Sequence, residues 1–241
     1  MSLAPGWYVI LVGEAMDLSS LPIVFTEPDL KFVRDGDEWL VTSSSFSTAS
    51  GVDEVLDLAR ELMERVNGAM KLVDAQYNQV KAAHVIEIRP NGTKNISVTV
   101  QAMHMSFRTG MAQVVVTDAQ GIVVPQPASP AIKWVKLAET DQTATEILWL
   151  LSLPDQDWHS LYKLHELTQG QGGHQWAYQA GVVSKSNMER LTATANNFSA
   201  SGRKARHARL GMSPLKLQPM TLDEATHVMR AVAKRWLEDR C

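Results

Sequence analysis

The spacing of hydrophobic residues changes along this chain, and the change falls at a proline-rich segment. Before residue 125, several short runs alternate apolar and polar residues, as half-buried β-strands do. Beyond residue 130, apolar residues recur every three or four positions, as on one face of an α-helix. Pro125, Pro127 and Pro130 donate no backbone hydrogen bonds and favour an extended chain. The sequence therefore predicts two domains, at 1–125 and 131–241.

The first domain is predicted to be an antiparallel β-meander with one long helix. Strands are expected at 7–13, 39–42, 83–88, 96–101, 111–116 and 122–124, with a polar, proline-containing loop after the first. Asn91-Gly92 supplies the positive φ angles that a tight hairpin turn needs. Between these strands, apolar residues from Val52 to Met70 define a helix, and Ser50 with Asp53 fits a capping box at its start. Together these elements predict an α+β fold.

The second domain is predicted to be an α-helical bundle. One helix is expected to run from Leu137 to Leu151 and to end near Pro154, after which Asp155 or Asp157 caps the next. Glycines at 170–173 break that helix. Capping-box pairs then predict two further helices, and these pairs are Ser186 with Glu189 and Thr221 with Glu224.

Composition excludes several classes of protein. The 241 residues are 45% hydrophobic and 20% charged, which is typical of a soluble globular protein. The single cysteine, Cys241, can form no intramolecular disulfide and no cysteine-based zinc site. No apolar run approaches the roughly 20 residues of a membrane span, and no signal peptide is recognisable. We therefore expect a cytoplasmic protein with no membrane association. Because the histidines are scattered in the sequence, we expect no metal site, and we expect no cofactor.

Charge is divided unevenly between the two predicted domains. Residues 1–125 have a net charge of −6, and residues 126–241 have a net charge of +3. No acidic residue occurs between Glu189 and Asp223, a stretch that contains many cations and His207. These cations are predicted to bind an anion, and they are Arg190, Arg203, Lys204, Arg206, Arg209 and Lys216. The alternatives are a solvated basic stretch and a stretch that docks on the protein's own acidic domain.

A polar Asn-Asn-Phe-Ser-Ala-Ser-Gly segment leads into Arg203-Lys204-Ala205-Arg206-His207, and an amphipathic helix follows. This C-terminal part resembles HEPN-type domains, helical bundles of which many are metal-independent ribonucleases that act as dimers in defence and toxin systems. The resemblance implies a catalytic group of His207, Arg203 and Arg206. In RNA cleavage without a metal, a histidine transfers protons near the 2′-OH, and arginines stabilise the developing phosphate charge.

Three functions remain open from the sequence. The leading hypothesis is a non-enzymatic binding protein, whose sheet engages a partner protein or a second copy and whose basic loop holds RNA or another anion. The second is the HEPN-like ribonuclease. A helix–turn–helix with its turn at 181–186 and its recognition helix at 188–197 is a third interpretation, although that helix offers few base-reading side chains besides Arg190 and asparagines.

Overall fold

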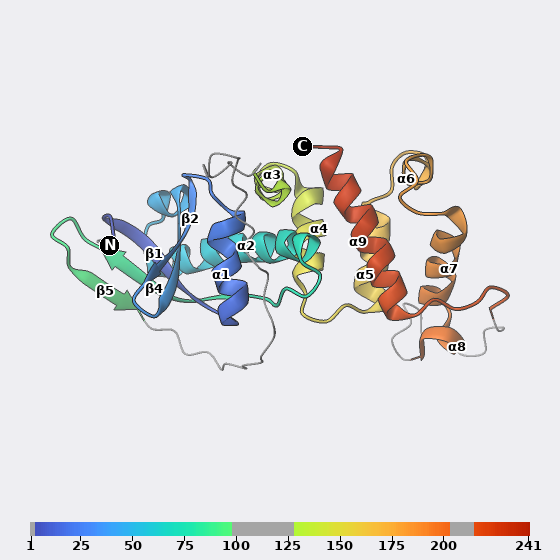
Figure 1. Cartoon of the computed structure of the whole chain (residues 1–241), viewed down its shortest axis with the longest axis horizontal. Helices are drawn as coiled ribbons and strands as arrows, with labels where there is room; N and C mark the ends of the chain where they lie inside the picture. Colours follow the sequence, from blue (N-terminus) through green and yellow to red (C-terminus); the bar gives the residue numbers. More distant parts are fainter. Residues whose placement is uncertain (1–2, 98–127, 203–214) are drawn as a thin grey trace, which may run out of the picture. The chain divides into compact units, whose positions relative to one another are not determined.

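The computed structural model describes residues 3–97, 128–202 and 215–241. The chain divides into two compact units, Met1–Lys133 and Trp134–Cys241, and each is described by itself. The first contains an antiparallel sheet with helices and the second is helical, which confirms the α+β class (Figure 1). The strands predicted at 111–116 and 122–124, and two of the three boundary prolines, lie outside the described residues.

The sheet has its first strand in the middle. Its strands are β1 (Gly6–Val12), β2 (Leu30–Asp35), β3 (Glu38–Ser43), β4 (Lys81–Ile88) and β5 (Lys94–Ser97). Their order is β2-β3-β1-β4-β5, and every neighbouring pair is antiparallel. Two hairpins, β2–β3 and β4–β5, therefore flank β1. The predicted hairpin at Asn91-Gly92 is confirmed between β4 and β5, but only Gly92 has a positive φ, of 81°, and Asn91 does not.

The predicted loop after β1 is wrong. Residues 15–24 form α1 (Ala15–Val24), and residues 30–35 form the edge strand β2. Pro22 lies inside α1 and signals a loop when read alone. Leu18, Leu21 and Val24 nevertheless recur at three-residue spacing and are buried, so packing against the sheet outweighs the missing backbone donor.

Both faces of the sheet are apolar. Cross-strand partners share a face, so Val9, Val41 and Val85 lie together. The opposite face carries a buried cluster formed by Tyr8, Ile10, Leu40, Ile86 and Ile88. The long helix α2 (Val52–Val73) packs against β4 and β1. A sheet buried on both sides supplies the core that the first unit needs for stability.

The capping box predicted for α2 is wrong by one residue. Gly51 is the N-cap and offers no side chain. Ser50 instead donates from its backbone N–H and from Oγ to Glu54 Oε2, at 2.7 and 2.6 Å. These hydrogen bonds hold the pKa of the Glu54 carboxyl below its usual value. Because Ser50 lies one residue before the N-cap Gly51, its carboxylate partner is Glu54, one residue beyond the predicted Asp53.

A buried amide joins α2 to the chain that enters β4. Asn67 Nδ2 donates to Val80 O at 2.9 Å, while Asn67 Oδ1 accepts from Val80 N at 3.0 Å and from Tyr77 Oη at 3.1 Å. Both Asn67 and Tyr77 are buried. Gly13 lies against the same segment, where a Cβ would stand 2.9 Å from Val80 Cγ2. The amide thus satisfies polar groups that would otherwise be buried without partners.

The second unit is built on three helices that pack together. These are α4 (Gln142–Ser152), α5 (Trp158–Leu167) and α9 (Leu222–Glu238), which lie side by side in Figure 1. The shorter α6 (Gln175–Gln179), α7 (Lys185–Asn196) and α8 (Phe198–Ser201) follow α5, and α3 (Pro130–Leu137) spans the division between the units. No helix in the described part of the chain is long and apolar enough to cross a membrane.

The helix boundaries test four predictions for this unit. The single helix from Leu137 to Leu151 is wrong, because α3 ends at Leu137 and Asp141 caps α4 by accepting from Ala144 N at 3.0 Å. The cap at Asp157 and the capping box of Thr221 with Glu224 are confirmed. The box of Ser186 with Glu189 is wrong, because Ser184 caps α7 and accepts from Asn187 N at 3.1 Å. α7 therefore starts earlier than the sequence indicated.

We expect Asn67→Ala to destabilise the first unit by about 3 kcal/mol, because it leaves two backbone groups and one hydroxyl of the buried network without partners. Tyr77→Phe removes only one of the three hydrogen bonds and should cost about 1 kcal/mol. Urea unfolding of the full chain, followed by circular dichroism, measures both changes. Equal losses for the two variants would contradict the role given to the amide.

Candidate functional site

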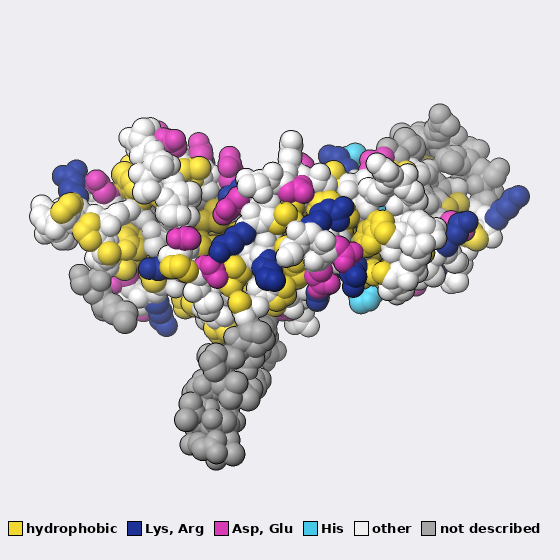
Figure 2. Space-filling model, turned by 90° about the horizontal axis from the view of Figure 1, so that it is seen from above, with side chains coloured by type: hydrophobic (Ala, Val, Ile, Leu, Met, Phe, Trp, Pro, Cys, Tyr) yellow, Lys and Arg dark blue, Asp and Glu magenta, His cyan; other side chains and the backbone are white. Residues whose placement is uncertain are grey.

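The predicted anion-binding residues fall into two groups. Arg203, Lys204, Arg206, His207 and Arg209 lie outside the described residues, so their predicted roles stay predictions. Arg190 and Lys216 are described, and Lys216 is exposed. In the view of Figure 2, Lys and Arg side chains lie interspersed with Asp and Glu side chains over the described surface. On the face seen in Figure 2, the described residues therefore form no continuous positive patch.

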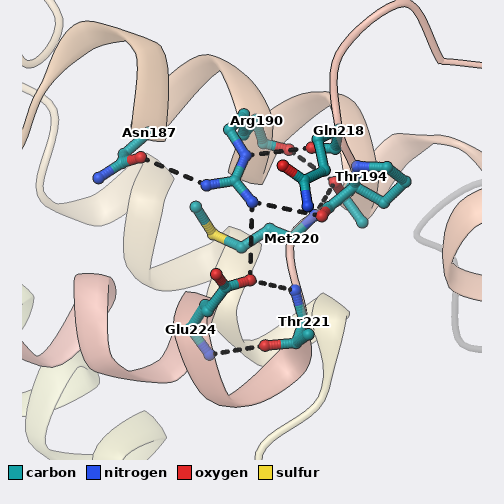
Figure 3. Close-up of polar contacts among 8 residues, drawn as sticks. Asn187, Arg190, Thr194, Gln218, Met220, Thr221 and Glu224 are labelled. Carbon is teal, nitrogen blue, oxygen red and sulfur yellow. Dashed lines mark hydrogen bonds and ion pairs between the residues drawn. The ribbon is translucent and has the colours of Figure 1, made fainter.

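Arg190 is bonded within its own unit. Its Nε donates to Gln218 O at 3.1 Å and its Nη2 to Pro219 O at 3.3 Å (Figure 3). Nη2 also lies 3.6 Å from Glu224 Oε2, at the start of α9. With the side chain only 20% exposed, the guanidinium serves to hold the chain before α9 against α7. We therefore leave Arg190 out of the proposed anion-binding set.

Glu224 connects this network to the cap of α9. Its Oε2 accepts from Thr221 N at 2.8 Å, and Thr221 Oγ1 accepts from Glu224 N at 3.1 Å. The Thr221 backbone N–H and, to a smaller degree, the Arg190 guanidinium hold the pKa of the Glu224 carboxyl below its usual value. Glu224 therefore stays ionised at the helix terminus that favours negative charge.

Thr194 holds both ends of the basic stretch. Its Oγ1 donates to Arg190 O at 2.7 Å and accepts from Met220 N at 3.0 Å. Its backbone carbonyl accepts from Ser201 Oγ at 2.9 Å. Ser201 precedes the cations of the stretch and Met220 follows them, so the chain leaves α7 and returns to it at one buried residue. Ser201 and Met220, which flank stretch 202–219, therefore both lie at the second half of α7.

The connection between α6 and α7 is a tight turn. Gly181 has a φ of 68°, its N–H donates to Tyr178 O at 3.1 Å, and Val182 N donates to Ala177 O at 3.0 Å. This hydrogen-bond pattern ends a helix with a left-handed residue, where glycine has no steric cost. Figure 1 shows α6 almost end-on while α7 runs nearly in the plane of the picture, so the two axes cross steeply. Ala177, whose carbonyl accepts from Val182 N, is fully buried.

α7 has a buried face and a polar face. Met188, Leu191 and Ala195 are buried, and α7 packs against α5. Four residues on the polar face form what we call the outer stripe: Lys185, Glu189, Thr192 and Asn196. Lys185 and Glu189 are exposed, and Thr192 and Asn196 are half-buried. Lys185 Nζ lies 3.8 Å from Glu189 Oε1. At about 100° per residue, Arg190 and Thr194 lie roughly 130° and 170° around the helix from the centre of this stripe, so the internal contacts and the stripe occupy different faces of α7.

Two histidines converge beneath the corner between α5 and α6. The rings of His165 and His174 have centroids 4.6 Å apart, and both residues are buried. His174 Nε2 lies 3.1 Å from Thr168 Oγ1, and Trp176 Nε1 donates to Thr168 O at 3.2 Å. Burial, and secondarily the charge of His165, lowers the pKa of His174 to about 4. Sequence spacing did not predict this pair, because the turn at 170–173 reverses the chain between the two residues.

No three residues in the described part of the chain are grouped as ligands for a metal ion. No model of a known protein family matches this chain, and no curated protein or solved structure matches it either. The candidate site therefore rests on the geometry of α6, α7 and the anchored stretch. The sequence did not point to Thr194, because a threonine within a helix gives no sign that its hydroxyl accepts a hydrogen bond from a distant backbone N–H.

We expect Thr194→Val to destabilise the protein by about 1–2 kcal/mol, because the Met220 N–H loses its acceptor in a buried site. The Met220 amide should also exchange with solvent deuterium much faster than in the wild type. Thr192→Val is the matched control, since Thr192 Oγ1 bonds only to carbonyls of its own helix. Unchanged exchange at Met220 in Thr194→Val would rule out this anchor.

The lowered pKa of His174 predicts a loss of stability in acid. Between pH 6.5 and about 4 the unfolded chain binds a proton at this residue that the folded chain excludes, so stability falls as the pH decreases through this range. We expect the free energy of unfolding to drop by about 2 kcal/mol from pH 7 to pH 5, and His174→Gln to lose most of that dependence. His227→Gln, which removes an exposed histidine of α9, is the control. A slope that persists in His174→Gln would refute the assignment.

Proposed function

We propose that the unit Trp134–Cys241 binds nucleic acid and does so without cleaving it. The observation that supports this proposal most directly is the anchoring of stretch 202–219 at Thr194. A basic segment tied at both ends to one helix loses less conformational freedom on binding than a free tail does. Its cations then act together on one ligand.

The charge of the stretch fits a polyanion. Five cations are candidates for contacts to phosphate, and they are Arg203, Lys204, Arg206, Arg209 and Lys216. No acidic residue of the stretch competes with the phosphates for these side chains. Each contact releases a counterion from the nucleic acid, so affinity should decrease steeply with salt concentration.

Two other hypotheses from the sequence are retained as outcomes of the test. In a HEPN-like ribonuclease, His207 would transfer protons while Arg203 and Arg206 stabilise the phosphate. Alternatively, the basic stretch would pair with the acidic first unit. The partner protein expected for the sheet stays a prediction.

The test measures binding of the full chain to labelled single-stranded RNA and duplex DNA by fluorescence anisotropy over a salt series. For Arg203→Gln with Arg206→Gln, we expect the slope of log K against log salt to decrease by about 1.5 to 2 for the ligand that binds. The matched control is Lys163→Gln with Lys234→Gln, which removes two exposed cations of the same unit. This control should leave the slope unchanged.

Three results would contradict the proposal. Equal slopes for the two double variants would mean that the stretch does not contact phosphate. Absence of binding to either probe at low salt would leave the stretch to an intramolecular role. Cleavage of RNA in the presence of a chelator that is lost in His207→Ala would identify the ribonuclease instead.

A further inference from the structure

The start of α7 gives the unit a surface that the sequence did not predict. Because Ser184, and not Ser186, is the N-cap, the helix already includes Lys185 and Ser186. Both are exposed, as is Glu189 one turn later. The polar face of α7 is therefore longer than a helix that begins near Met188 would provide. Lys185 and Glu189 place a cation and an anion one turn apart on this face.

This face belongs to the second of two helices that are joined by a tight turn. The left-handed Gly181 ends α6, Val183 is buried in the turn, and Ser184 opens α7. The two axes cross steeply in Figure 1, α7 packs against α5, and Lys185 and Glu189 at the start of the outer stripe are exposed. A helix held in this way can enter a groove without a rearrangement of the unit.

We propose that α7 is the recognition helix of a helix–turn–helix and docks in the major groove of duplex DNA. The inference rests on the proposed function and specifies its ligand. In B-form DNA the major groove is about 12 Å wide and admits an α-helix, whereas the major groove of duplex RNA is too narrow and deep for side chains to read. A polar helix face that is held on a folded unit therefore fits duplex DNA better than duplex RNA.

The side chains of the outer stripe match the chemistry of base edges. An ammonium group such as that of Lys185 donates to guanine O6 and N7, and a carboxylate such as that of Glu189 accepts from the amino group of cytosine. These residues replace Arg190, whose guanidinium is bonded to Gln218, Pro219 and Glu224, as the base-reading group.

The experiment selects binding sites from a pool of random duplex DNA with the full-length chain. We expect an enriched sequence motif, bound at least about tenfold more tightly than a scrambled duplex and than single-stranded RNA of equal length. In Lys185→Ala with Glu189→Ala, the preference over scrambled DNA should fall about tenfold or more. The salt slope should change by at most about one contact, because Arg203 and Arg206 are retained.

The control is Lys234→Ala with Glu238→Ala, which removes a lysine and a glutamate at the same spacing from the exposed face of α9. It should leave the enriched motif and its affinity unchanged, and thermal unfolding verifies that both variants fold. Binding with no enriched motif, or equal binding of single-stranded RNA and duplex DNA, would overturn the docking of α7 but leave the proposed function intact. A motif that survives in Lys185→Ala with Glu189→Ala would also overturn it. No binding to any nucleic acid would overturn both.

Discussion

The hydroxyl of Thr194 is the contact on which the arrangement of the second unit around α7 depends. Arg190 and Thr194 lie about one helical turn apart on α7. Arg190 donates to the carbonyls of Gln218 and Pro219. Thr194 Oγ1 accepts from the N–H of Met220, the next residue after Gln218 that has an N–H. Glu224 then joins the start of α9 to the same guanidinium. These polar contacts fix the entry of α9 and, with it, the return of the basic stretch. A buried hydroxyl that is fully satisfied stabilises one arrangement because any other would leave a backbone group without a partner.

The same contacts divide the cations of the unit by role. Arg190 stabilises the fold, whereas the cations of stretch 202–219 and Lys185 are proposed to meet a nucleic acid. A guanidinium with five donors in a fixed plane suits two carbonyls and a carboxylate that converge on it. The outer stripe of α7 carries smaller or more flexible polar groups, which can adjust to bases in a groove. The proposed DNA site and the internal network therefore use separate faces of one helix.

The sequence predicted the elements whose residues form a regular local pattern. The prediction was right for the helix that contains Val52 to Met70 and for the capping box of Thr221 with Glu224, because helix period and capping are local properties. The prediction from sequence was wrong at α1, where Pro22 suggested a loop. It was also wrong at the start of α7, because Ser184 and Ser186 are equally plausible N-caps by sequence and Ser184 is the one that caps the helix. Of the candidate site, Lys216 was predicted and is exposed, whereas Arg190 was predicted as an anion-binding residue and is bonded within the unit. Five of the predicted residues lie outside the described residues.

Periodicity and composition were enough to predict the α+β class and to show the unequal division of charge, because neither requires knowledge of distant contacts. The three-dimensional fold was needed to show that β1 lies between two hairpins, that His165 meets His174, and that Thr194 bonds to the residues on both sides of the basic stretch. The hydroxyl of Thr194 and the N–H of Met220 are 26 residues apart along the chain. A hydrogen bond between them depends on how α7 and α9 each pack against α5, which is set by the sum of many apolar contacts rather than by either residue.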